Sequence, residues 1–216
     1  ATVVFYSGDM MRLLLMEPPE SSDARHPVRL FAGSGLRADD HARFGARFGN
    51  PNIAEFYAST EGPIVLVNSA GEKAGAVGRP LPGAGELALV DVHLGTMDAR
   101  RNTHGRCRVV GVGEAGMLIG RVDPAKPFGS WDGFVDPAIS ESRLLRDVVE
   151  EGDVWFSTGD MFRNDTAGDY FFLGRKSDLI ATGDGPRSLR ELVDVLERVP
   201  GVGLAAAWRA GLGEHR

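Results

Sequence analysis

The first third of the chain alternates short apolar runs with polar loops. Two runs rich in branched and aromatic residues are typical of strands, and phenylalanines four residues apart between them mark one face of a helix. The expected elements are a strand and a short helix within residues 2–16, a strand at 28–32, a helix capped by Asp39 or Asp40 that ends at 49–51, and a strand at 53–57. This order predicts a parallel α/β sheet, and ligands of such sheets gather at the carboxyl ends of the strands.

Beyond Glu61 the apolar runs become short and numerous. Turns rich in glycine, proline, Asp and Asn separate them. The expected strands are residues 64–67, 86–92, 108–112, 117–122 and 170–173, interrupted by one helix over Pro137–Val149. This spacing predicts a small β-barrel or a sandwich.

A last amphipathic helix follows near the end of the chain. Ser188 and Glu191 have the spacing of a capping box, and apolar residues recur at helical intervals from Leu189 to Val199, before a Pro-Gly pair. We therefore expect three parts. They are an α/β piece over residues 1–68, a β-rich barrel subdomain with one helix over 69–174, and a hinge with the truncated start of a C-terminal domain over 175–216.

Composition and charge narrow the function classes. The 216 residues carry 24 Lys and Arg against 30 Asp and Glu, a formal charge of −6, and the arginines are scattered. Nucleic-acid binding relies on clustered cations, so no nucleic-acid partner is expected. The single cysteine, Cys107, excludes an intrachain disulfide and favours the cytoplasm. No apolar run approaches the roughly 20 residues that span a bilayer, whereas peripheral membrane contact is left open.

Three short motifs carry candidate chemistry. Phe56–Gly62 follows an expected strand with an aromatic ring, hydroxyls and a carboxylate, which suit adenine, phosphate and Mg²⁺. In Trp155–Asp160, an Asp after a Gly at a strand end can accept the hydroxyls of a ribose. Gly174–Asp178 offers an arginine for a ribose or phosphate, followed by short residues that suit a hinge. Each motif alone fits an ordinary polar turn better than a ligand site.

Together, in this order and spacing, the motifs resemble the adenylate-forming superfamily of acyl-CoA and aryl-CoA ligases, nonribosomal adenylation domains and luciferases. The narrower resemblance is to the fatty-acid transport protein and very-long-chain acyl-CoA synthetase branch, and it spans residues 3 to about 202. The segments that carry it are Tyr6–Asp9, Val28–Arg37, Arg47–Gly49, Glu55–Gly62, Gly75–Arg79, Asn102–Cys107, Phe134–Pro137 and Gly152–Asp160. The resemblance implies part of the large adenylate-binding domain, an α/β piece followed by a small β-barrel.

The resemblance also implies roles for five side chains. Tyr57 would stack on adenine, Thr60 would contact the α-phosphate, and Glu61 would help to hold Mg²⁺, so that Thr60 and Glu61 are the catalytic candidates. Asp160 would bind the ribose hydroxyls of ATP or AMP with help from Arg175.

The resemblance implies further site positions, and a few residues depart from the family. Gly33, Ser34 and Gly35 would line the adenine and acyl pocket, and Ser177 would occupy the hinge of the C-terminal domain. Ala58 stands where the family usually has glycine, and many relatives have Asp or Lys at the place of Ser177. The loop at 181–186 does not follow the pattern of the transport-protein branch, which puts a CoA tunnel in question.

The leading hypothesis is a fragment of a long-chain or very-long-chain fatty-acid–CoA ligase. The parent enzyme would use ATP and Mg²⁺ to form an acyl-adenylate from a carboxylic acid and would pass the acyl group to CoA. Neither a phosphate loop before residue 1 nor the adenylation lysine is present, so the missing N-terminal part is an expected partner and the isolated chain is expected to be almost inactive. The alternative is a non-catalytic nucleotide-binding or scaffold module derived from the same fold.

Overall fold

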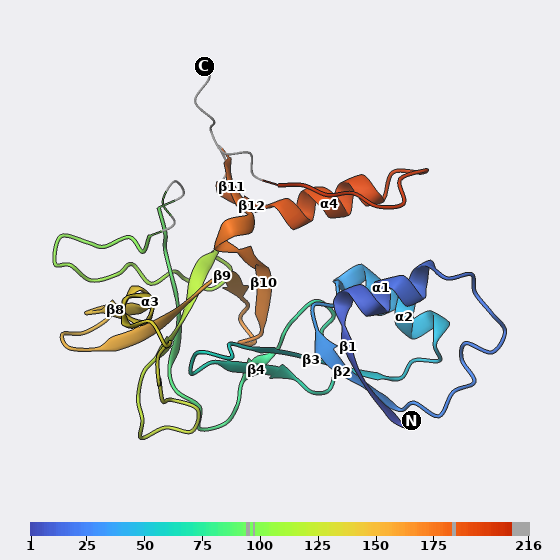
Figure 1. Ribbon diagram of the computed structural model, residues 1–216, viewed down its shortest axis with the longest axis horizontal. Coiled ribbons are helices and arrows are strands. Elements are labelled where there is room, and N and C mark those ends of the chain that lie inside the picture. Colours follow the sequence, from blue (N-terminus) through green and yellow to red (C-terminus); the bar gives the residue numbers. More distant parts are fainter. Residues whose placement is uncertain (94–95, 97, 183–184, 209–216) are drawn as a thin grey trace, which may run out of the picture.

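The computed structural model describes residues 1–93, 96, 98–182 and 185–208. Figure 1 shows an α/β half, a β-rich half and a C-terminal helix that lies over the α/β half. In the described part of the chain, no helix has the length and apolarity needed to cross a bilayer.

The α/β half is a five-stranded sheet with two helices on one face (Figure 1). Its elements are β1 (Val3–Ser7), α1 (Gly8–Met16), β2 (Leu30–Ser34), α2 (Ala38–Arg47), β3 (Asn52–Ala58), β4 (Val65–Asn68) and β5 (Arg79–Pro80). Strands β1, β2 and β3 are parallel, as predicted, and β4 and β5 add antiparallel strands. Met11 and Phe44, both fully buried, anchor the two helices on the sheet. The cap of α2 is Arg37 rather than Asp39 or Asp40, which lie in its first turn, where their charge favours the helix dipole.

The second half is β-rich, but its sheet is open rather than a closed barrel. Its strands are β6 (Leu87–Val90), β7 (Gly116–Arg121), β8 (Leu144–Arg146), β9 (Val154–Asn164) and β10 (Tyr170–Arg175). They run antiparallel in the order β10-β9-β7-β6, with β8 also beside β9. The run expected at 108–112 makes only an isolated bridge, between Val90 and Val109, so no strand there extends the sheet toward closure.

The helix predicted over Pro137–Val149 is less than half that length. Helix α3 spans Pro137–Ser142, with Asp136 accepting a hydrogen bond from the backbone of Ala138 at its start. The chain then enters β8, which pairs with β9. The apolar spacing fitted a helix, but backbone pairing with the long neighbouring strand determined the structure, a common outcome for short apolar runs.

The two halves share an apolar core. Ile64 and Leu66, at β4, are fully buried in one cluster with Leu118 of β7 and with Phe156 and Phe162 of β9. One face of the open sheet therefore packs against the antiparallel edge of the α/β half. This contact fixes the carboxyl end of β3 relative to β9 and β10.

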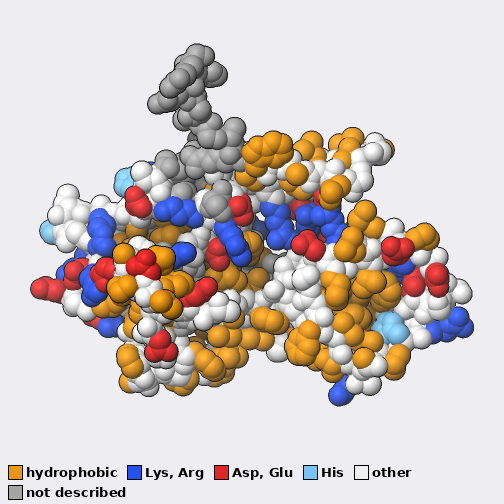
Figure 2. All heavy atoms as spheres, in the orientation of Figure 1, with side chains coloured by type: hydrophobic (Ala, Val, Ile, Leu, Met, Phe, Trp, Pro, Cys, Tyr) orange, Lys and Arg blue, Asp and Glu red, His pale blue; other side chains and the backbone are white. Residues whose placement is uncertain are grey.

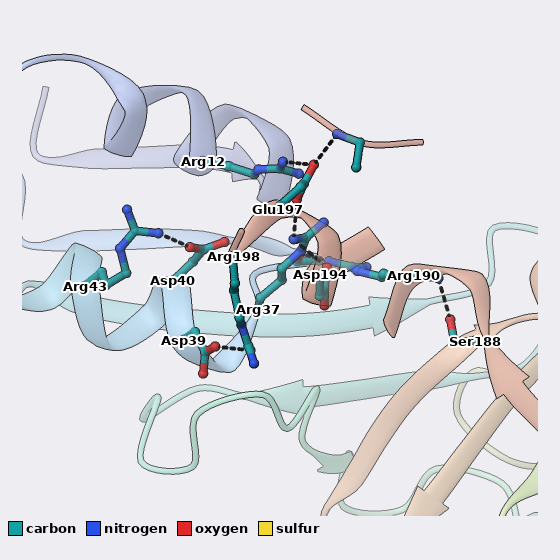
Figure 3. A network of polar contacts seen from close by, with 12 residues as sticks. Arg12, Arg37, Asp39, Asp40, Arg43, Ser188, Arg190, Asp194, Glu197 and Arg198 are labelled. Atoms are coloured by element: carbon teal, nitrogen blue, oxygen red, sulfur yellow. Dashed lines mark hydrogen bonds and ion pairs between the residues drawn. The ribbon is translucent and has the colours of Figure 1, made fainter. Parts of the chain in front are cut away.

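The C-terminal segment rests on the α/β half through charges. It comprises the 3₁₀ turn η1 (Lys176–Asp178), β11 (Leu179–Thr182), β12 (Gly185–Ser188) and α4 (Leu189–Glu197), the helix expected at this position. Ser188 caps α4 by accepting a hydrogen bond from the backbone of Arg190, whereas the side chain of Glu191 lies outside the described residues. Acidic side chains of α4 face arginines of the α/β half (Figure 3), and hydrophobic side chains line its outward side (Figure 2). The ion pairs of this contact are Arg12–Glu197, Arg37–Asp194, Arg37–Glu197 and Arg198–Asp39.

The shared core makes a testable prediction at Gly62, which lies in the turn after β3. A Cβ added to Gly62 would lie 2.2 Å from the ring of the buried Phe156. Gly62→Ala should therefore destabilise the chain by about 1–3 kcal/mol, the usual penalty for overpacking, measured by urea unfolding.

The matched control is Gly203→Ala, where a Cβ would meet nothing within 4 Å. This variant should unfold at the same urea concentration as the native chain. Equal midpoints for Gly62→Ala and Gly203→Ala would contradict the described packing between the halves.

Candidate functional site

A cleft of about 780 Å³ opens where the turn after β3 meets β9 and β10. Its wall contains five of the side chains singled out from the sequence: Tyr57, Thr60, Glu61, Asp160 and Arg175. Residues separated by more than a hundred positions along the chain therefore share one cavity. An adjoining cavity of about 420 Å³ shares Tyr57, Asp160 and Arg175 with the cleft.

Strand β3 carries Tyr57 to the boundary between the two halves. Its ring packs edge-on against Phe162 at a centroid distance of 4.9 Å. Its hydroxyl donates a hydrogen bond of 2.7 Å to Oδ2 of Asp160. Burial, and then the neighbouring Asp160 carboxylate, raise the pKa of Tyr57, so the hydroxyl stays protonated and remains a donor at neutral pH.

A bulge in β9 presents Asp160 to the cleft. Met117 pairs with Met161 and Ile119 pairs with Ser157, so three residues of β9 oppose Leu118 alone. The Thr158 hydroxyl fixes this bulge, because it donates to the carbonyl of Leu118 at 2.8 Å and accepts from the backbone N–H of Asp160 at 3.0 Å. The prediction that Asp160 follows a strand end was wrong: the strand continues to Asn164, and the bulge redirects the side chain instead.

Asp160 sits among cations. Arg175 is its direct cross-strand partner in the β9–β10 ladder, at the last residue of β10. Burial raises the pKa of the Asp160 carboxyl, and the hydrogen bond from Tyr57 and the charges of Arg175 and Arg143 partly offset that rise. The Asp160 carboxylate is thus half-buried and oriented by Tyr57. The Tyr57 hydroxyl contacts only one of the two carboxylate oxygens, Oδ2.

Thr60 and Glu61 lie on the exposed turn that borders the same cleft. Ser59 shapes the turn: its N–H donates to the carbonyl of Ile64, and its hydroxyl donates to Glu61 at 3.2 Å. Slight burial opposes ionisation of Glu61, but hydrogen bonds from Thr60 and Ser59 and the charge of Arg143 bring its pKa below the ordinary value. Glu61 is therefore ionised at neutral pH.

Two carboxylates border the cleft, Glu61 and Asp160, and they define what metal chemistry it can support. Within the described residues, no group of three or more His, Cys, Asp or Glu side chains could hold a metal ion. Mg²⁺ is commonly bound by one or two carboxylates together with substrate phosphates and water, and the exposed, ionised Glu61 fits that mode.

The glycine-rich segment at the end of β2 divides between two roles. Ser34 and Gly35 line the adjoining cavity. Gly33 lines neither cavity: a Cβ there would lie 2.1 Å from the carbonyl oxygen of Tyr6. Gly33 therefore permits close approach of β1 and β2 rather than contact with a ligand.

Sequence reasoning assigned no role to Glu55, a buried carboxylate behind this segment. Its side chain is only 3% exposed and accepts hydrogen bonds from the backbone N–H groups of Gly35 and Leu36, each 3.2 Å long, and from the Tyr6 hydroxyl. Burial raises the pKa of Glu55 despite these donors. A signal was available in the sequence. Ile53, Glu55 and Tyr57 are two residues apart along β3, so their side chains lie on the same, inward face of the strand.

Arg143 was also missed, because the predicted helix over Pro137–Val149 gave it no relation to the motifs. The structure places it between α3 and β8, on the wall of the cleft beside Thr60 and Glu61.

Comparison with known proteins finds relatives of this chain. No family model matches the chain. It is 38% identical over 178 residues to a medium/long-chain fatty-acid–CoA ligase of Mycobacterium tuberculosis, covering 82% of this chain and 29% of that protein. It is 36% identical over 199 residues to long-chain fatty acid transport protein 3 of Mus musculus, covering 91% of this chain and 29% of that protein. The chain thus spans about three tenths of the length of these relatives.

Solved structures show the same relation. The ATP-bound MatB of Rhodopseudomonas palustris matches 96% of this chain and 37% of its own, with a TM-score of 0.72 and 26% identity. A benzoate CoA ligase of Burkholderia xenovorans matches 98% of this chain and 38% of its own, with a TM-score of 0.69 and 25% identity. The relatives of this chain are thus fatty-acid–CoA ligases and long-chain fatty acid transport proteins, and its structural neighbours are adenylate-forming CoA ligases.

Proposed function

We propose that this chain supplies the nucleotide cleft of an ATP-dependent fatty-acid–CoA ligase. The complete enzyme would join a fatty acid carboxylate to the α-phosphorus of ATP, releasing pyrophosphate, and would then transfer the acyl group to the sulfur of CoA, releasing AMP. One observation carries the proposal: Tyr57, Thr60, Glu61, Asp160 and Arg175 border a single cleft. A scaffold that bound no nucleotide would have no chemical need for that set.

Each side chain has a proposed role that its surroundings support. Tyr57 offers a ring held in place by Phe162 as a platform for adenine. Asp160 keeps one oxygen on Tyr57 and has the other for ribose hydroxyls, with Arg175 beside it. Thr60 would donate to the α-phosphate from the exposed turn.

Mg²⁺ would bind at Glu61 together with phosphate oxygens, where it would neutralise charge on the triphosphate. Ser34 and Gly35, on the wall of the adjoining cavity, would border the adenine and the acyl group. CoA is proposed as the acceptor from the relatives alone. The loop at 181–186, which bears on a CoA tunnel, includes residues 183–184, and these lie outside the described residues.

We also retain the proposed division of the chain. Residues 1–68 and 69–174 would form the two parts of the nucleotide-binding domain, and 175–216 would begin a smaller domain. Ser177 would serve as its hinge, since it lies in η1, a single short turn directly after Arg175. A cytoplasmic location is part of the proposal, as is an N-terminal part of the same enzyme that completes the acid pocket.

Binding of AMP provides the direct test. The native chain should bind AMP in calorimetric titrations, and Asp160→Ala should weaken binding by at least about tenfold, because the carboxylate makes charge-assisted hydrogen bonds to the ribose. The matched control is Asp132→Ala, an exposed aspartate outside both cavities, which should bind AMP as the native chain does.

The pH dependence gives a second readout of the same site. Protonation of the Asp160 carboxylate should weaken AMP binding as the pH is lowered. Because the pKa of Asp160 is raised, this loss of affinity should begin at a higher pH than it would with an ordinary aspartate. Asp160→Asn should remove that fall. No AMP binding by the native chain, or equal binding by the native chain and Asp160→Ala, would refute the proposal.

The role proposed for Glu61 makes a separate prediction. Mg²⁺ should increase the affinity of the native chain for ATP, and Glu61→Gln should reduce this increase several-fold while leaving affinity for AMP without metal unchanged. Because the pKa of Glu61 is lowered, the Mg²⁺ effect should stay constant from pH 8 to about pH 6 and be lost only in more acidic solution. An unchanged Mg²⁺ effect in Glu61→Gln would remove Glu61 as a metal ligand.

A further inference from the structure

Arg143 is held at a fixed position beside the cleft by its own backbone. It is the C-cap residue that follows α3, and its N–H donates to the carbonyl of Ser140 at 3.1 Å. Its carbonyl accepts a hydrogen bond of 2.7 Å from the N–H of Ser157, the last residue of β9 before the bulge. The base of the arginine is thus tied to the strand that carries Asp160.

The guanidinium lies over the bulge. Nη1 of Arg143 is 3.5 Å from the carbonyl oxygen of Thr158. The same atom would be 3.2 Å from a Cβ placed on Gly159, so a side chain at that position would crowd it. Glycine at position 159 therefore has two reasons. It adopts the left-handed φ of +74° that the bulge requires, and it leaves room for the guanidinium of Arg143.

Arg143 forms no ion pair among the residues that the structure describes. Within the described part of the chain, no acidic oxygen lies within the 4.0 Å of an ion pair, although Arg143 is close enough to lower the pKa of both Glu61 and Asp160. Arg146, three residues further on, is the contrast: it forms a two-pronged contact with Glu141 at 3.0 and 3.1 Å. A half-buried guanidinium on a cleft wall that makes no ion pair with any described carboxylate is suited to an anionic ligand.

We propose that Arg143 is an anion-binding residue that contacts the β- and γ-phosphate groups of ATP, and the pyrophosphate they form when released. This inference rests on the proposed function and extends it. Asp160 and Arg175 are cross-strand partners and are proposed for the nucleoside, whereas Arg143 lines the same cleft as Thr60 and Glu61, the residues proposed for phosphate and Mg²⁺, and its charge lowers the pKa of Glu61. A planar guanidinium there can bind two phosphate oxygens at once and can offset negative charge on the leaving group.

The experiment compares four probes on the 216-residue chain by calorimetry: adenosine, AMP, ATP with Mg²⁺, and inorganic pyrophosphate. Arg143→Gln should lower the affinity for ATP and for pyrophosphate by about tenfold to a hundredfold, the range for a charge-assisted hydrogen bond. It should leave the affinity for adenosine unchanged. Arg143→Lys should recover part of the loss, because it keeps the charge but not the fork. Arg146→Gln is the matched control and should leave all four affinities unchanged.

The outcomes separate this inference from the proposed function. If ATP affinity is unchanged in Arg143→Gln while Asp160→Ala still weakens AMP, the inference is wrong and the nucleotide cleft stands. If Arg143→Gln weakens adenosine as much as ATP, its role is structural and the inference is wrong. If pyrophosphate binds through Arg143 but adenosine and AMP do not bind, the anion site stands and the proposed function fails. If no probe binds to the native chain, both are overturned.

Discussion

The hydrogen bond from Tyr57 to Asp160 is the contact on which the cleft depends. Its two ends come from different sheets, at the carboxyl end of a parallel strand and at the bulge of an antiparallel one. The buried core between β4 and the open sheet brings these strands together, and the hydrogen bond then fixes the orientation of the carboxylate within the shared wall. The donor stays protonated and the acceptor has a second oxygen to offer, so under the proposed function this contact would position a ligand as well as join the two sheets.

Departures from regular structure supply much of the site. The three-residue bulge in β9 turns Asp160 toward the cleft, and a left-handed glycine within it leaves room for Arg143. The buried carboxylate of Glu55 holds the turn after β2 by its backbone N–H groups, which keeps Gly35 on the wall of the adjoining cavity. Bulges and buried polar groups of this kind stabilise a fold poorly by themselves, so their presence around these two adjoining cavities is consistent with a site selected for ligand geometry.

The sequence predicted the parallel strands and α4 because their apolar periodicity coincides with the packing that buries them. It did not predict the open sheet or the end of α3 at Ser142, because the pairing of Leu144–Arg146 with β9 depends on residues remote in sequence. For the same reason the motif residues Tyr57 and Asp160 could be named but their contact could not be derived. Arg143 was assigned to a helix, and only the tertiary structure places it beside Glu61.

The most direct measurement is a crystal structure of this chain with AMP bound. The account predicts adenine against the ring of Tyr57, a ribose hydroxyl within hydrogen-bonding distance of the free oxygen of Asp160, and the phosphate toward Thr60. AMP bound on another surface, or in the cleft with its ribose away from Asp160, would contradict it.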